Sequence, residues 1–160
     1  MRNRLLFALT AALACIVAAG GIALATTPNG VTSTLFAISQ LDEIHAKVLS
    51  SDWQARIDTK GASDVWVLEN RIVPGGSFGW HSHPGPSIVV VKSGALTVYR
   101  GDDATCTPEV IPAGSGFVEA GDIHLVRNEG SVDTVVYVTS IVPRGAARRI
   151  DEPSPGNCSF

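Results

Sequence analysis

Apolar residues recur with a period of two along much of this chain, in short runs separated by turns. Between residues 64 and 73, Trp66, Leu68 and Ile72 share one face of an extended segment, while the other face mixes valine with charge. We expect the even-numbered face to lie in the core. Shorter runs of similar character occupy residues 31–38, 53–59, 87–92, 95–100, 109–111, 116–119 and 132–142. The pattern predicts a series of short strands.

Glycine and proline separate these runs about every ten residues, and no long amphipathic helix interrupts them. Clear turns fall at residues 60–63, 74–76, 93–94 and 112–116. This spacing is typical of an all-β sandwich or barrel. The run at residues 87–92 is apolar on both faces, so we expect it to be buried on both.

Residues 41–49 allow two interpretations. Leu41, Ile44, Val48 and Leu49 share a face at helical spacing, which predicts a helical turn. The alternative is an extended segment along the edge of the barrel. His45 lies in this segment and is expected to be an ordinary exposed or hydrogen-bonded side chain.

The first 25 residues have the pattern of an export signal. Arg2 and Arg4 precede an apolar run at residues 5–24, and Ala23-Leu24-Ala25 is a small-x-small cleavage pattern. The same run is about long enough to span a bilayer, so an uncleaved membrane tether through residues 5–24 is the alternative. We therefore expect an exported protein that is secreted, periplasmic or held at the cell surface.

The charge balance argues against nucleic acid as a partner. The 160 residues include 12 Lys and Arg against 15 Asp and Glu, a net charge of −3. Without residues 1–25 the net charge becomes −5, because both lost charges are arginines. No basic stripe appears along the chain.

Two cysteines, Cys106 and Cys158, remain outside the export segment, which contains Cys15. In an exported chain such a pair predicts a disulfide, which would close a loop of about fifty residues. The alternative is two unrelated free thiols.

Two of the four histidines lie one residue apart in the glycine- and proline-rich segment 75–87, which cannot be a helix. On an extended backbone, His81 and His83 point to the same face, and two converging imidazoles are a good start for a divalent metal site. A third histidine, His124, follows a turn in segment 119–128, at the start of a strand-like run.

The two segments together resemble the paired motifs of the cupin superfamily. Four residues match the first motif, and Ser87 stands where that motif has a glutamate. Three residues match the second motif, and Glu119 stands in the place of its proline. The matching residues are Gly75, His81, His83 and Gly94 in the first motif, and Gly121, His124 and Asn128 in the second.

The resemblance implies a single cupin jelly-roll barrel, also called a double-stranded β-helix. The expected organisation is a signal peptide or membrane anchor at residues 1–25, an N-terminal extension with edge strands at 26–62, the barrel at 63–143 and an irregular C-terminal tail at 144–160. The tail is expected to be ordered only if something such as the disulfide holds it.

The resemblance also implies that His81, His83 and His124 bind a divalent transition metal: Fe, Zn, Cu, Ni or Mn. Ser87 shares the parity of the first two histidines and is the candidate for a fourth position, although Glu69 or Glu119 is an alternative oxygen donor. Neutral protein ligands would make manganese less suitable and would favour an anionic small-molecule ligand. The side chain of Asn128 is expected to make hydrogen bonds either within a turn or to the residues that hold the metal ligands in place. The candidate pocket residues are Phe78, Trp80, Val89 and Tyr99.

Cupins include enzymes and proteins without catalysis, so the fold does not select one function. One hypothesis is a metal-dependent, dioxygenase-like oxidoreductase acting on a small substrate. A second is a non-catalytic module that binds a small ligand or a metal, and a third is a metal-free structural barrel. The expected partners are a small molecule and, in a homodimer, a second copy of the chain.

Overall fold

The computed structural model describes residues 25–160, and within that range every regular element is a strand. The predicted export signal or anchor falls on residues 1–25, so all but its last residue lies outside the described range. No helix in the described part of the chain is long and apolar enough to cross a membrane. The strands are β1 (Asn29–Leu41), β2 (His45–Leu49), β3 (Gln54–Asp58), β4 (Ser63–Ser82), β5 (Ser87–Ser93), β6 (Ala95–Arg100), β7 (Glu109–Pro112), β8 (Gly116–Glu119), β9 (His124–Arg127), β10 (Thr134–Pro143) and β11 (Ile150–Asp151).

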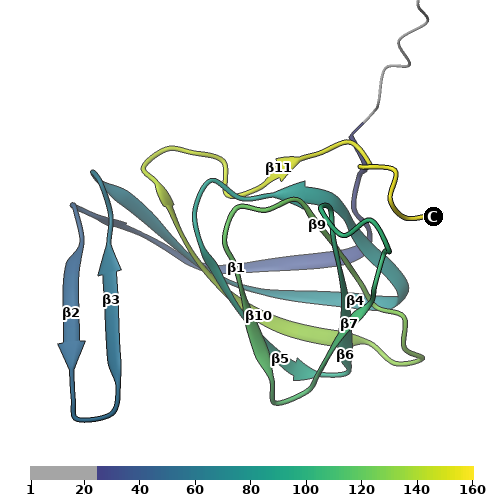
Figure 1. Ribbon diagram of the computed structural model, residues 1–160, viewed down its shortest axis with the longest axis horizontal. Coiled ribbons are helices and arrows are strands. Elements are labelled where there is room, and N and C mark those ends of the chain that lie inside the picture. Colours follow the sequence, from purple (N-terminus) through teal and green to yellow (C-terminus); the bar gives the residue numbers. More distant parts are fainter. Residues whose placement is uncertain (1–24) are drawn as a thin grey trace, which may run out of the picture.

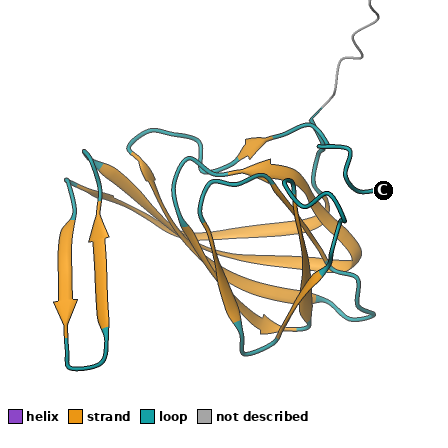
Figure 2. Ribbon diagram, viewed as in Figure 1, coloured by secondary structure: helices purple, strands orange, loops and turns teal. Residues whose placement is uncertain are grey.

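Nine of the strands form one sheet, in the order β7-β6-β9-β4-β10-β5-β8, with β1 and β11 also paired to β4. The long strand β4 is the centre of this arrangement, because its first half pairs with both β1 and β10, and its end pairs with β9 and β11. The sheet curls around an interior, as Figures 1 and 2 show. The prediction of an all-β barrel is confirmed.

Alternate side chains from the strands fill the barrel. Leu68 and Ile72 of β4 are buried as predicted, and Trp66 is half-buried against the same cluster. Burying a Val, Leu or Ile side chain stabilises a fold by about 1.5–3 kcal/mol. This apolar cluster therefore holds the strands that carry the site. Its other buried members are Val89, Val91, Leu96, Val98, Ile111, Val126, Val136 and Val138.

Strand β5 is buried on one face only, contrary to the expectation. Val89 and Val91 face the core, whereas Ile88 and Val90 are 50% and 47% exposed. The strand lies between β10 and β8 in a single curved layer, so only its inner face meets the barrel interior. Nothing within the described residues covers the outer face.

The helical turn predicted at residues 41–49 is wrong. Strands β2 and β3 form an antiparallel hairpin instead, with His45 opposite Asp58 and Leu49 opposite Gln54. Pairing with β3 gives the backbone of β2 its hydrogen bonds without a helix. The extended alternative was correct in conformation, but the hairpin stands away from the barrel rather than along its edge (Figure 1).

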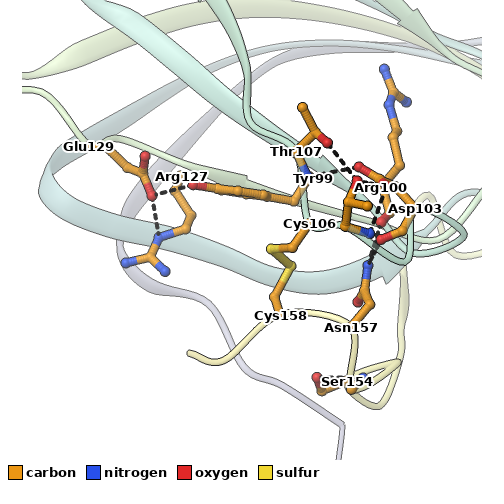
Figure 3. Close-up of a disulfide and its surroundings, with 12 residues drawn as sticks. Tyr99, Arg100, Asp103, Cys106, Thr107, Arg127, Glu129, Ser154, Asn157 and Cys158 are labelled. Carbon is orange, nitrogen blue, oxygen red and sulfur yellow. Dashed lines mark hydrogen bonds and ion pairs between the residues drawn. A yellow bond between two sulfur atoms is a disulfide. The ribbon is translucent and has the colours of Figure 1, made fainter.

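The C-terminal tail is ordered and is joined to the barrel by the predicted disulfide, Cys106–Cys158. The amide of Asn157 donates hydrogen bonds to the carbonyl oxygens of Arg100 (2.9 Å) and Asp103 (2.7 Å), next to the disulfide (Figure 3). Further back, β11 pairs with the end of β4. The tail therefore returns across the barrel at the end where the histidines lie.

Candidate metal centre

The barrel brings the three predicted histidines to one place. His81 lies on β4 and His124 begins β9, and the antiparallel register of these strands sets the two residues opposite each other. His83 follows β4 directly, and all three side chains are buried. The ring centroids are 4.3 Å apart for His81 and His124, 5.0 Å for His81 and His83, and 5.4 Å for His83 and His124.

A β-bulge at Gly79 aims the end of β4 into the barrel. The register between β4 and β9 shifts between Ser77 and Trp80, and Gly79 has a φ of +70°. A side chain at Gly79 would collide with the carbonyl group of Thr26 and would be strained at this φ. Because the bulge inserts one residue, Phe78 and His81 face the same interior despite their different parity.

Each imidazole is oriented by a backbone carbonyl oxygen, which accepts a hydrogen bond from Nδ1. A carbonyl oxygen can only accept, so Nδ1 carries the hydrogen and the neutral ring presents the Nε2 lone pair. Holding the far nitrogen in this way is how metal-binding histidines are usually oriented. The acceptors are Gly79 for His81 (2.9 Å), Arg148 for His83 (2.7 Å) and Asp122 for His124 (2.7 Å).

Glu119 completes the group from the end of β8. Its Oε2 lies 3.0 Å from Nε2 of His83, and its Oε1 lies 2.9 Å from Nε2 of His124. One ligand atom from each histidine and one from Glu119 all lie within 4.8 Å of one another. The four side chains therefore form a compact, buried set of three nitrogen donors and one carboxylate.

Ser87, the candidate for the fourth position, makes a hydrogen bond to another side chain instead of pointing to the three histidines as a ligand. Its hydroxyl shares a hydrogen bond of 2.8 Å with the hydroxyl of Ser140, and both residues are fully buried. In the pairing of β5 with β8, Ser87 lies directly opposite Glu119. The carboxylate missing from Ser87 is therefore supplied by its neighbour across the strands, and Glu69 instead faces Lys92, 3.8 Å away.

The arrangement fits a bound cation. Nε2 of His83 and Nε2 of His124 have no hydrogen-bond partner, although both approach oxygens of Glu119. Lone pairs facing a carboxylate at this distance repel unless positive charge lies between them. Three imidazoles and a carboxylate are a donor set for divalent transition metals.

The surroundings of His81 and Glu119 favour the protonation states that can bind a metal. Burial, reinforced by His124, lowers the pKa of His81 to about 2, so its ring is neutral near pH 7. For Glu119, burial would raise the pKa, but hydrogen bonds and positive charge from the rings of His124 and His83, when those rings are protonated, outweigh burial and lower the pKa below the usual range. A cation bound in their place would lower the pKa in the same way. Glu119 is therefore a carboxylate.

A small cavity of about 20 Å³ adjoins His81, His83 and Glu119. Its size is close to that of one water molecule. Phe78 and Val89 line it, together with Phe117 and the side chain of Arg148. The wall is mainly apolar, with Arg148 as its cation.

Trp80 and Tyr99, by contrast, do not line this cavity. Both belong to a separate buried cluster with Leu125 and Cys158. Trp80 precedes His81 on β4 and so faces the opposite side of the strand, where Tyr99 and Trp80 both lie opposite Leu125. Their role is to pack beneath the disulfide.

Replacing Ser87 tests this assignment. We expect Ser87→Ala to leave metal content unchanged and to cost about 1–3 kcal/mol of stability, because the buried hydroxyl of Ser140 loses its partner. The Ser87→Ala, Ser140→Ala double variant should recover most of that loss. Metal analysis and urea unfolding of the three proteins give the comparison, and loss of metal from the single variant would make Ser87 a ligand.

The sequence analysis missed Arg148, which orients His83 through its carbonyl oxygen and lines the cavity with its side chain. It lies in a tail without periodicity or motif, so no signal in the sequence marks it. Asn128, by comparison, does bond within a turn: its amide donates to the carbonyl oxygens of Ile72 and Val132, both at 2.8 Å.

The fold and the site together define a β-barrel with a buried cluster of potential metal ligands, and comparison with known families agrees on the fold. The family model described as Cupin domain matches residues 69–141. Residues 69–141 therefore form a cupin domain. A search of curated proteins found no significant match.

Several solved structures resemble the chain. The polyketide cyclase RemF from Streptomyces resistomycificus is 18% identical, with a TM-score of 0.47, over 57% of this chain and 64% of that one. A cupin domain from Bordetella pertussis Tohama I is 21% identical, with a TM-score of 0.47, over 72% and 96%. An oxalate oxidase in complex with the substrate analogue glycolate is 26% identical, with a TM-score of 0.47, over 79% and 57%. The chain thus spans less than two thirds of the cyclase and of the oxidase.

Proposed function

We propose that this protein binds a divalent transition metal through His81, His83, His124 and Glu119, and uses it as a dioxygenase-like oxidoreductase on a small substrate. The observation that supports this is the convergence of four buried ligand atoms next to a cavity. A metal with four protein ligands keeps positions open for substrate when its coordination number is five or six. When bound, it supplies a Lewis-acidic and redox-active centre.

The residues of the chain have distinct tasks in this proposal. The backbone carbonyl groups hold the three rings in the tautomer that binds metal. Phe78, Val89 and Phe117 exclude bulk water from the cavity. The carboxylate of Glu119 widens the choice among Fe, Zn, Cu, Ni and Mn, because hard cations such as manganese favour carboxylate oxygen.

Metal analysis combined with oxygen consumption tests the proposal. We expect about one redox-active metal per chain and oxygen uptake on at least one member of a panel of small organic substrates. His45→Ala is the matched control, since His45 is 66% exposed on the hairpin and lies outside the site. A wild-type protein without metal contradicts the whole proposal, and metal without turnover contradicts its catalytic part.

The second candidate function is a non-catalytic module that retains a small ligand or a metal. The small volume of the cavity favours it, because about 20 Å³ admits little more than a water molecule without a rearrangement. Bound zinc with no turnover would support it. In a metal-free structural barrel, the third alternative, the rings of His83 and His124 would have to be protonated to pair with Glu119.

Substitution of Glu119 separates a metal site from a structural ion pair. We expect Glu119→Gln to lower metal affinity at least tenfold, because the variant keeps the shape of the side chain but loses its charge and its stronger donor oxygen. Competition with a chromophoric chelator measures the affinity, with Glu109→Gln as the control. Glu109 is exposed and pairs with Arg100 at the rim of the barrel. Equal affinities would remove Glu119 from the ligand set.

We further propose that the protein is exported, which the pattern of residues 1–25 and the Cys106–Cys158 disulfide support, since disulfides persist in oxidising compartments. Fractionation of cells and the mass of the mature chain test export, cleavage and the tether through residues 5–24. The homodimer stays a prediction, which sedimentation of the purified protein tests.

A further inference from the structure

The segment at residues 146–153, which we call the strap, closes one side of the metal centre. Its strand β11 pairs with the end of β4, with Ile150 opposite Ser82 and Asp151 opposite His81. The hydroxyl of Ser82 donates to Oε1 of Glu152 at 2.7 Å, and the backbone amide of Glu152 donates to the carbonyl oxygen of Trp80 at 3.0 Å. The strap is therefore bonded to the stretch of backbone that carries His81.

Two neighbouring arginines in the strap have different surroundings. Arg149 is committed to structure, because its guanidinium donates to the carbonyl oxygen of Phe78 at 2.6 Å and pairs with Asp151. Arg148 makes its recorded hydrogen bond through its carbonyl oxygen, and no ion pair or hydrogen bond of its guanidinium is found among residues 25–160. Its side chain instead lines the cavity beside His83 and Glu119.

A half-buried guanidinium without a protein partner has unused donors. Arginine presents five N–H groups in a planar fork that matches a carboxylate, and it keeps its charge even where burial disfavours it. Burial does lower the pKa of Arg148, while the nearby Glu119 opposes the shift. The fork is thus held at the wall of the cavity, available to a ligand that brings its own oxygens.

The charge of the site indicates the kind of ligand. Three neutral imidazoles and one carboxylate leave a divalent metal with one net positive charge, and Arg148 adds a second. The rest of the cavity wall is apolar, from Phe78, Val89 and Phe117. A small anion would neutralise this excess, whereas a neutral or cationic ligand would leave it uncompensated in a poorly hydrated space.

We propose that Arg148 determines ligand specificity by binding the carboxylate group of a small organic anion beside the metal position. This inference rests on the proposed metal site and adds the chemical class of its ligand. Because the cavity holds little more than a water-sized group, it would accept only the carboxylate end of such an anion, and the rest of the ligand would extend out of the cavity. Because the backbone of the same residue orients His83, one residue of the strap contributes to both metal and ligand.

Titration calorimetry with acetate and its neutral analogue acetamide tests the proposal on the metal-loaded protein. We expect wild type to prefer acetate at least tenfold, and Arg148→Gln to lose most of that preference while it keeps its metal. Arg148→Lys should retain part of it, since the charge remains without the fork. Arg144→Gln is the control for net charge, because Arg144 lies on the same tail but bonds to Leu41 and is absent from the cavity wall.

The possible outcomes are distinct. Unchanged acetate preference in metal-loaded Arg148→Gln overturns the assignment of Arg148 and leaves the metal site intact. Loss of metal from Arg148→Gln and also from Arg148→Lys makes the residue a structural support of His83, which overturns the ligand role. A wild-type protein that binds no metal overturns both proposals together.

Discussion

His124→Ala removes the metal: we expect the metal content to fall from about one ion per chain to less than a tenth, and the His81→Ala, His124→Ala double variant to behave in the same way. The two residues face each other across β4 and β9, so each loss removes a donor from the middle of the set. With one or two imidazoles removed, the remaining donors hold the ion more weakly than the complete set does. Elemental analysis of protein purified in exported form measures the effect.

A folding control is needed because both rings are buried. Thermal unfolding of the metal-free wild type and of the variants shows whether the barrel survives, and His45→Ala shows the effect of losing an exposed histidine. Equal metal content in the double variant and in wild type, with both folded, would exclude this group of residues as the site.

Removing the disulfide has the second large effect. We expect Cys106→Ser with Cys158→Ser to lose on the order of 4 kcal/mol of unfolding free energy, as the chain-entropy model gives for a sequence separation of 52 residues. The cluster of Trp80, Tyr99 and Leu125 would also lose its cover, because Cys158 packs against it. Urea unfolding of the variant and of oxidised wild type gives the difference.

Reduced wild-type protein is the matched control, because it breaks the same bond without substitution. We also expect faster loss of metal to a chelator in both proteins, since the tail that bears the carbonyl acceptor for His83 is less firmly anchored. Equal stability in the oxidised and reduced forms would show that the tail is held by its other contacts alone.

Much of the barrel was predictable because its strands and turns are marked by residues that are close together in the sequence. The alternation of Leu68 and Ile72 marks the inner face of β4, and glycine or proline marks most turns. The fold class and the proximity of the histidines followed from two motifs. The hairpin β2–β3 was missed because Leu41, Ile44, Val48 and Leu49 fit a helical face, and only pairing with β3 decides for the strand.

The fourth ligand was not predictable with the same certainty. Ser87 and Glu119 each depart from the motif they occupy, and the sequence analysis placed Ser87 in the fourth position, with Glu119 only as an alternative donor. In the folded protein the two residues are cross-strand neighbours, so the departures compensate each other. The register between β5 and β8 is a long-range property of the sheet, and no short spacing in the sequence reveals it.

Of the four predicted pocket residues, Phe78 and Val89 line the cavity, whereas Trp80 and Tyr99 do not. Phe78 and Trp80 have the same parity, and simple alternation would place both on one face. The bulge at Gly79 puts the two side chains on opposite faces of β4. Phe78 therefore lines the cavity, whereas Trp80 faces away from it. Arg148 was missed because the tail acquires its position only from the barrel that it crosses.

The strap is synthesised after the barrel strands, so the site is completed late in the synthesis of the chain. A ribosome that has completed the barrel strands through Pro143 has not yet made Arg148, so the nascent chain has every proposed ligand but lacks the acceptor that fixes the ring of His83. The last anchoring residue, Cys158, comes almost at the end of the chain. If the proposed metal site exists, its full affinity therefore develops only after the strap has been synthesised and has paired with β4.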